Sequence, residues 1–321
     1  MAKINSKQAV NFVTQYSIYV ITLVFMIICA FINDRFLTVD NIINILRQVS
    51  VYALLAFAES VCIISGNLDL AAASTLVFAG CLSIFVYVGT GSLILAVIVA
   101  ILIGVVINLI SGIIVAYFNI PPFVATLGMQ MSVRGAVYLL TDGMTISETG
   151  ENFKALGQGY VGPIPNPVII MMVCAVIFWV ILDKTRLGRN FYAVGGNREA
   201  ARASGINLRK YTILAYLVAG AFTGLAGIVY CSRINAGTPA GAQGYEGQGI
   251  AAAVIGGIGF AGGTGNAWGA VIGAVVIGII NNILNLMGVN SYMQQVVNGL
   301  VIVLAVGLDT FTRSKRTSRC V

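Results

Sequence analysis

Long apolar stretches recur along this chain of 321 residues, and they limit its fold more than any other feature. A helix that crosses a membrane needs about 20 mostly apolar residues. Ten stretches are candidates, of which the sixth and eighth are short: Phe12–Ile32, Val49–Ser65, Leu68–Val88, Ser92–Tyr117, Pro122–Leu140, Val168–Leu182, Tyr211–Ser232, Gly249–Phe260, Ala267–Leu286 and Met293–Phe311. We expect each short stretch either to extend into flanking residues or to be a partly broken helix covered by its neighbours. The sequence predicts an all-α polytopic bundle of about ten transmembrane helices, with residues 1–321 in a single transmembrane domain.

Charged residues make up only 9% of the chain, whereas about 25% is usual in a soluble domain. The chain therefore has too few charged residues to cover a water-facing surface. The sequence has no histidine, which excludes Ser–His catalysis, histidine metal sites and histidine pH switches. We therefore predict that the chain is not an enzyme and that it has no catalytic residues, no metal site and no cofactor of its own.

The basic residues gather in short loops and tails, which suits membrane orientation better than nucleic-acid binding. With the N-terminus inside and ten spans, 13 of the 18 Lys and Arg residues fall in inner segments and four in outer ones. Cytoplasmic loops of membrane proteins carry such an excess. The pattern predicts a multi-pass protein with both termini in the cytoplasm, lipid around it and no nucleic-acid partner.

Small residues indicate close helix packing. Gly220 and Gly224, like Gly269 and Gly273, are four positions apart, a spacing that lets membrane helices approach closely; bending at a gate is the alternative. Five of the six cysteines fall in apolar stretches and no pair has CxxC spacing, so we expect reduced packing residues.

Two glycine turns, Ser65–Asn67 and Gly262–Thr264, each join two apolar stretches at the inner side. They are a weak sign of an internal repeat, and we take Gly66 and Gly262 as structural or gating positions. Two buried carboxylates, also structural or gating candidates, lie near the first turn. Asp69 is expected to cap a helix that starts near Leu68. Glu59 lies deeper, either in a structural pair with Arg134 or on a transport pathway.

Amide side chains recur within the apolar stretches. Such groups hydrogen-bond hydroxyl-rich solutes, and they also hold membrane helices together. As a set they suit a neutral polar solute better than an ion, because an ion pathway should contain more buried charge. The pathway candidates are Asn67, Gln130, Asn281 and Asn282.

The chain has no nucleotide site of its own by these criteria. Gly257, Gly259 and Gly262 match G-x-G-x-x-G, but they lie in a membrane hairpin, and position 282 is Asn282 instead of an acidic residue. The sequence contains no G-x-x-x-x-G-K-[ST] motif. If ATP drives this protein, another subunit binds it.

The loop Asp183–Lys210 is basic and lies on the predicted inner side. Asn197 is a plausible N-cap, the residues from Arg198 to Ser204 favour a short helix, and Gly205 favours its end. A loop that only anchors the orientation needs charge but no capping signals at both ends. We therefore interpret this segment as a docking helix for a cytoplasmic partner.

This loop, together with three further segments, resembles the permease subunits of bacterial ABC importers for monosaccharides, the ribose, xylose, arabinose and galactose group. The resemblance covers about residues 41–309 and is carried by Thr185–Arg189 with Gly195–Asn207, Ile250–Gly257, Asn281–Gly288 and Ser65–Leu70. It identifies the short helix with the family's EAA-type loop, which docks in the ATPase. The docking residues are then Arg198, Glu199, Ala200, Ala201, Ser204 and Gly205.

The resemblance implies a machine with a second permease subunit, expected to be a second copy, a cytoplasmic ABC ATPase that binds ATP and Mg²⁺, and an extracytoplasmic sugar-binding protein. The chain would then be the permease of an ATP-driven monosaccharide importer in the bacterial inner membrane. This sequence has Gly247-Gln248 where the family usually has Leu-Asp, and in the first hairpin Asn67 and Ala71 also depart from the family's usual residues. The identity of the sugar therefore stays open. The alternatives are a related importer permease for a small polar solute such as an amino acid, and an ion-coupled secondary transporter.

Overall fold

The computed structural model describes residues 19–20, 22–147 and 149–317. In these residues, eight helices are long and apolar enough to cross a membrane. They are α2 (Val39–Ile64), α3 (Ala72–Thr90), α4 (Leu93–Phe118), α5 (Pro122–Thr141), α7 (Asn166–Trp179) with its continuation η1 (Val180–Lys184), α10 (Leu208–Ile234), α12 (Ala267–Leu286) and α13 (Ser291–Thr317). The predicted polytopic helical bundle is confirmed.

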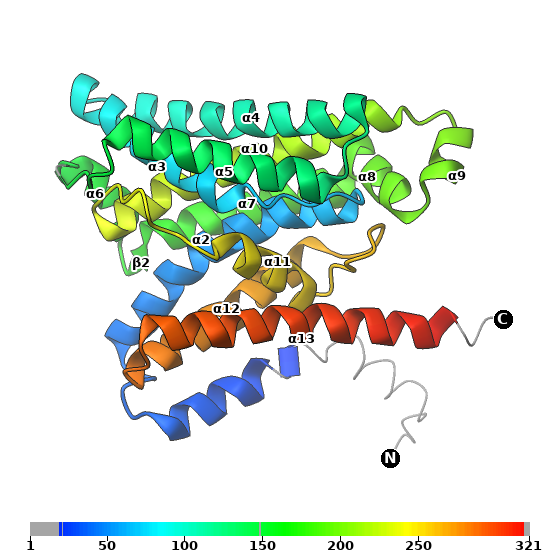
Figure 1. Cartoon of the computed structure of the whole chain (residues 1–321). Helices are drawn as coiled ribbons and strands as arrows, with labels where there is room; N and C mark the ends of the chain where they lie inside the picture. The colour runs from blue at the N-terminus through cyan, green and yellow to red at the C-terminus, as the bar shows by residue number, and fades with distance from the viewer. Residues whose placement is uncertain (1–18, 21, 148, 318–321) are drawn as a thin grey trace, which may run out of the picture.

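Shorter elements connect these helices. They are α6 (Glu151–Gln158), α8 (Arg186–Gly196), α9 (Arg198–Ala203) and α11 (Tyr245–Ile255), and an antiparallel hairpin of β1 (Tyr160–Val161) and β2 (Ile164–Pro165). Figure 1 shows α8, α9 and the C-terminal end of α13 at one end of the bundle, and α6 with β2 at the other. The most basic loop and the basic end of α13 therefore share one end, as the charge pattern predicts for the inner side.

Helix α2 lies at the centre of the bundle. It contacts α7, α10, α11 and α12, and 89% of its most apolar 18-residue stretch is buried. In the corresponding stretch of α4 the buried share is 28%, and in that of α13 no residue is buried. Apolar side chains on those outer helices face the position that lipid takes in a membrane, where no water-facing polar layer is needed.

Glycines set the closest helix contacts. A Cβ atom on Gly220 or Gly224 of α10 would lie under 3.0 Å from a backbone oxygen of α4. Gly269 and Gly273 of α12 meet the backbone of α11 in the same way. The predicted role of these four glycines in packing is confirmed. The five described cysteines are free and buried, as expected of packing residues.

Three predicted spans need comment. The eighth, Gly249–Phe260, is wrong as a span, because α11 has 11 residues and is only about 17 Å long. It is the partly broken helix that was the alternative, with a loop over residues 256–266 in place of its second half. The sixth instead extends to 19 residues by way of η1. The first lies partly outside the described residues, of which Thr22–Ile32 is an apolar helix.

Candidate functional site

The basic loop Asp183–Lys210 folds into two short helices, α8 and α9, one closely after the other. Thr185 accepts a hydrogen bond at its hydroxyl from the N–H of Gly188 and starts α8. Helix α8 buries Phe191 and Val194, and the Phe191 ring packs edge-on against Tyr211 at 6.4 Å. The sequence reading did not predict this helix. Its cap, followed by Leu187, Phe191 and Val194 at helical spacing, was the signal that could have found it.

Helix α9 follows α8 after a single residue. Asn197 accepts at its side-chain oxygen from the N–H of Ala200 at 3.0 Å, and Gly205 ends the helix at φ +79°, a conformation that favours glycine. The predicted short helix with its two end signals is therefore confirmed. Its side chains are exposed except for that of Ala201, which is 4% exposed. A small, capped, solvent-facing helix suits docking to a partner, and that role stays a prediction for all six docking residues.

A polar cavity of about 530 Å³ opens near the other end of the bundle. Its wall comes from α2, α10, α11, α12, α13 and the loop before α11. Eight of its fifteen lining residues carry amides, three are tyrosines and one, Arg233, is charged. The lining residues are Gln48, Tyr52, Tyr230, Arg233, Ala240, Ala242, Gln243, Tyr245, Gln248, Asn281, Asn285, Ser291, Gln294, Gln295 and Asn298.

Hydrogen bonds between neighbouring amides order the cavity wall. Asn298 donates to the side-chain oxygen of Asn281 and Gln294 donates to that of Asn285, both at 2.9 Å. The buried side-chain oxygens of Gln248 and Asn298 have no hydrogen-bond partner among the described residues. The wall therefore keeps hydrogen-bonding capacity for a hydroxylated solute when its side chains rearrange.

Aromatic rings form the part of the cavity wall between α2 and α11. The Tyr245 ring lies edge-on to Tyr52 at 5.1 Å and to Tyr230 at 5.6 Å. Tyrosine combines an apolar ring with a hydroxyl, so it can contact both the C–H faces and the hydroxyls of a sugar.

Two smaller cavities adjoin the polar cavity at Gln243 and the start of α11. One, of about 310 Å³, includes Gln130, Arg134 and Glu246 in its lining. The other, of about 240 Å³, shares Gln248 and Asn298 with the polar cavity. All three cavities share Gln243 and lie around the N-terminus of α11, where it lies between α5 and α13 in Figure 1.

The predicted pathway residues lie in different surroundings. Asn281 lines the polar cavity, and Gln130 donates to Glu246 at 3.2 Å in the neighbouring one. Asn282 instead exchanges two hydrogen bonds with Asn41 of α2, at 3.0 and 2.7 Å. Asn67 donates to the backbone and side-chain oxygens of Ser65, within the first hairpin. The structure thus places Asn281 and Gln130 in two adjoining cavities and Asn282 and Asn67 in neither.

Arg134, the candidate partner of Glu59 in a structural pair, binds other groups instead. Arg134 donates to the backbone oxygens of Pro239 and Gly241, at 2.7 and 3.0 Å, and to the Ser74 hydroxyl at 3.2 Å. Glu59 is fully buried in α2, and its carboxylate oxygens have no hydrogen-bond partner among the described residues. The loop before α11 folds back onto α5, and its carbonyl oxygens take the guanidinium donors. No local pattern in the sequence indicates that fold-back.

The predicted start of the third span was also displaced. Helix α3 begins at Ala72 instead of near Leu68, so Asp69 precedes the helix and does not lie in its first turn. Asp69 accepts from the N–H of Ala71 at 2.9 Å and thereby closes the turn that leads into α3. Gly66 and Gly262, the other two structural or gating candidates, lie close together beside Gly195 at the end of α8.

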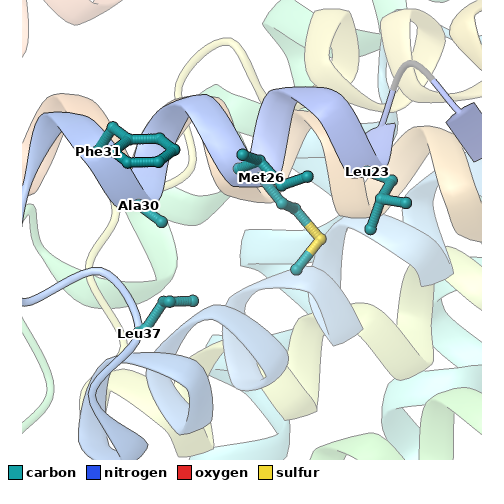
Figure 2. A pocket seen from close by; sticks show the side chains of 6 residues that line it. Leu23, Met26, Ala30, Phe31 and Leu37 are labelled. Atoms are coloured by element: carbon teal, nitrogen blue, oxygen red, sulfur yellow. The ribbon is translucent and has the colours of Figure 1, made fainter.

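An apolar groove lies elsewhere, at the first described helix. It has a volume of about 470 Å³ and is lined by Leu23, Met26, Ile27, Ala30, Phe31 and Leu37. Figure 2 shows Leu23, Met26, Ala30 and Phe31 along one helix and Leu37 on the segment that follows. A groove without polar groups suits a lipid chain and offers nothing to a polar solute.

Comparisons with known proteins place the chain among permeases. A family model described as the permease component of a branched-chain amino acid transport system matches residues 41–306. The ribose import permease protein of Haemophilus influenzae is 36% identical, over 95% of this chain and 96% of that protein. The galactose/methyl galactoside import permease protein of Salmonella typhimurium is 32% identical over 98% and 100%, and the D-allose transport system permease protein of Escherichia coli is 34% identical over 91% and 90%. No solved structure matches the chain.

Proposed function

Because this chain belongs to the permease family of bacterial ABC importers for monosaccharides, we propose that it carries a ribose-like pentose or a hexose across the inner membrane, driven by ATP. It is a multi-pass transport subunit and not an enzyme. The observation that carries the proposal is the polar cavity, with eight amides, three tyrosines and a single charged residue in its lining.

The composition of that lining favours a neutral, hydroxyl-rich cargo. Amides supply both donors and acceptors, so they can follow hydroxyl groups as a sugar turns in the cavity. An amino acid carries two opposite charges, and each would need a charged partner when taken out of water. Among the residues that line the polar cavity, Arg233 offers a partner for the carboxylate only. Arg134 and Glu246 line the neighbouring cavity, where they already bind backbone oxygens and Gln130. The names of the three relatives specify sugars, whereas the description of the family model specifies branched-chain amino acids.

The source of energy is proposed from α9. A helix this short, capped at both ends and exposed, needs a partner to be useful, and a cytoplasmic ABC ATPase is the partner of this family. ATP and Mg²⁺ belong to that subunit. In our proposal a second copy of the chain completes the pathway, and an extracytoplasmic binding protein delivers the sugar at the end that holds the polar cavity. Both termini are then cytoplasmic.

Transport follows an alternating-access cycle in this proposal. ATP closes the two ATPase subunits, α9 of each permease copy moves with them, and the bundle changes from outward-open to inward-open. The permease makes no covalent bond with its cargo. Amides that exchange hydrogen bonds with each other and with the sugar bind it weakly enough for release.

Cargo and energy source are tested together in cells that lack their own sugar importers. The chain is expressed with its ATPase and binding protein, and uptake of labelled ribose, galactose, allose and leucine is measured. We expect uptake of one or more of the sugars and none of leucine, and loss of that uptake when the ATPase is left out. Uptake of leucine in place of a sugar, or sugar uptake that persists without the ATPase, would contradict the proposal.

A further inference from the structure

Three segments that are far apart in the sequence meet at the base of α9. They are the end of α2 at Ile63–Gly66, the end of α8 at Gly195–Gly196, and Gly262–Gly263 in the loop between α11 and α12. The N–H of Gly263 donates to the carbonyl oxygen of Ile64 at 2.9 Å, and the Tyr192 hydroxyl donates to the carbonyl oxygen of Gly265 at 3.0 Å. We call this contact the glycine junction.

The segments of the glycine junction touch backbone to backbone. A Cβ atom on Gly195 would lie under 3.0 Å from the carbonyl oxygen of Ile64 and 2.9 Å from the nitrogen of Gly263. A Cβ atom on Gly263, which also has φ +69°, would lie 2.6 Å from the nitrogen of Gly196. Contacts of this kind contain no flexible side chain that could absorb a shift, so a displacement of one segment displaces the others.

The glycine junction lies between α9 and the polar cavity. On one side, Gly196 is followed directly by Asn197, the cap of α9. On the other side, α2 ends at the junction, and α11 and α12 flank the loop over residues 256–266 that contributes Gly262 and Gly263. The far parts of these three helices carry Gln48, Gln248 and Asn281 of the cavity wall. Each of these helices is a rigid rod on the scale of the cavity.

We infer that the glycine junction is the mechanical link that carries movement of α9 to the cavity wall, with Gly195 and Gly263 as the positioning residues. The inference rests on the proposed function, since it assigns the route of an ATP-driven movement. Burial raises the pKa of Tyr192 to about 12, so its hydroxyl keeps the proton that it donates to Gly265. That hydrogen bond makes the α11–α12 loop follow α8.

Two neighbouring glycines provide a matched test. Gly195→Ala forces a Cβ atom into the backbone of Ile64, whereas Gly196→Ala brings its Cβ atom only to within 3.8 Å of the nearest heavy atom, an ordinary contact. Both residues belong to α8, so neither change strains the local backbone. Each variant is reconstituted in proteoliposomes with the ATPase and binding protein. Subunit assembly, ATP hydrolysis and sugar uptake are measured on the same sample.

The measured quantity is sugar imported per ATP hydrolysed. We expect Gly195→Ala to assemble and hydrolyse ATP but to import about tenfold less sugar per ATP, since overpacking against backbone shifts the preferred arrangement by that order. Gly196→Ala should stay within about twofold of the wild type because it overlaps nothing. Tyr192→Phe keeps every backbone contact, and losing its hydrogen bond should lower the ratio about fivefold.

The outcomes separate the link from the function it serves. A wild-type complex that imports no sugar with ATP would overturn both the proposed function and the link. A wild-type complex that imports sugar, combined with equal ratios for Gly195→Ala and Gly196→Ala, would overturn the link alone. If Gly195→Ala fails to assemble, Tyr192→Phe decides, and a wild-type ratio for that variant would overturn the link.

Discussion

Two consecutive asparagines on α12 give the sharpest mutational test of the proposed pathway. Asn281 lines the polar cavity, while Asn282 faces α2 and exchanges hydrogen bonds of 3.0 and 2.7 Å with Asn41. Asn41 and Asn282 are 7% and 6% exposed. Neighbouring positions of one helix therefore serve different purposes, and alanine at each separates helix packing from transport.

The expected loss for Asn282→Ala follows from these contacts. Interhelical hydrogen bonds in membranes contribute about 0.6 kcal/mol each, so the two bonds to Asn41 are worth about 1 kcal/mol. The stranded side-chain oxygen of Asn41 adds a similar cost, for about 2 kcal/mol in all. In a double-mutant cycle with Asn41→Ala, the coupling between the two positions should be about 1 kcal/mol.

Unfolding by SDS in mixed micelles, followed by the fluorescence of Trp179 and Trp268, measures the stability of each variant. Sugar uptake per folded permease is measured in parallel. We expect Asn282→Ala to lose stability and to keep wild-type uptake per folded protein. Asn281→Ala should lower that uptake about fivefold, the factor carried by one lost hydrogen bond. An Asn282→Ala variant of normal stability and impaired uptake would contradict the assignment of Asn282 to helix packing.

Two further changes test other parts of the structure. Glu199→Lys on the exposed α9 should leave folding intact and abolish ATP-driven uptake, because it reverses charge where the ATPase is proposed to dock; normal uptake and normal co-purification with the ATPase would contradict this docking assignment. Gly220→Ala should destabilise the chain by about 1–3 kcal/mol, since its Cβ atom overlaps the backbone of Gly104. Gly128→Ala, which meets nothing within 4 Å, is the control in the same unfolding assay, and equal stabilities would show that the α4–α10 contact tolerates the added carbon.

Local signals explain what the sequence could predict. Helix α9 was predicted because Asn197, the alanines and Gly205 act within one short segment. Long spans were predicted because about 20 apolar residues have one stable form in lipid. Packing by Gly220 and Gly224 was predictable for the same kind of reason, since their spacing alone places both on one helix face.

Long-range arrangement explains the errors. Helix α11 ends at Ile255 because the following loop turns toward α8. The apolar character of the stretch Gly249–Phe260 does not show where the helix ends. Arg134 was a candidate partner for Glu59 on charge alone, but the loop before α11 folds back and offers it carbonyl oxygens instead. Asn281 and Asn282 are adjacent, and their side chains point to different sides of α12. Which of them faces the cavity therefore depends on how α12 packs against α2.

The polar cavity itself could not be derived from sequence. Of its eight amides, the sequence predicts only Asn281 as a pathway residue, because the eight are spread along the chain from Gln48 to Asn298. Only the packing of α2, α11, α12 and α13 brings them to one wall. The sequence does show that the apolar stretches contain amides and little charge, and the prediction of a neutral solute depends on that observation alone.

In our proposal, ATP hydrolysis on a partner subunit drives a neutral sugar through this chain. The most direct test is accumulation of labelled sugar against its gradient in proteoliposomes that contain the permease, the ATPase and the binding protein. ATP on the ATPase side is compared with H⁺ or Na⁺ gradients imposed without ATP. We predict accumulation with ATP, even when ionophores abolish all ion gradients. Accumulation that follows an ion gradient and needs no ATP would contradict the account.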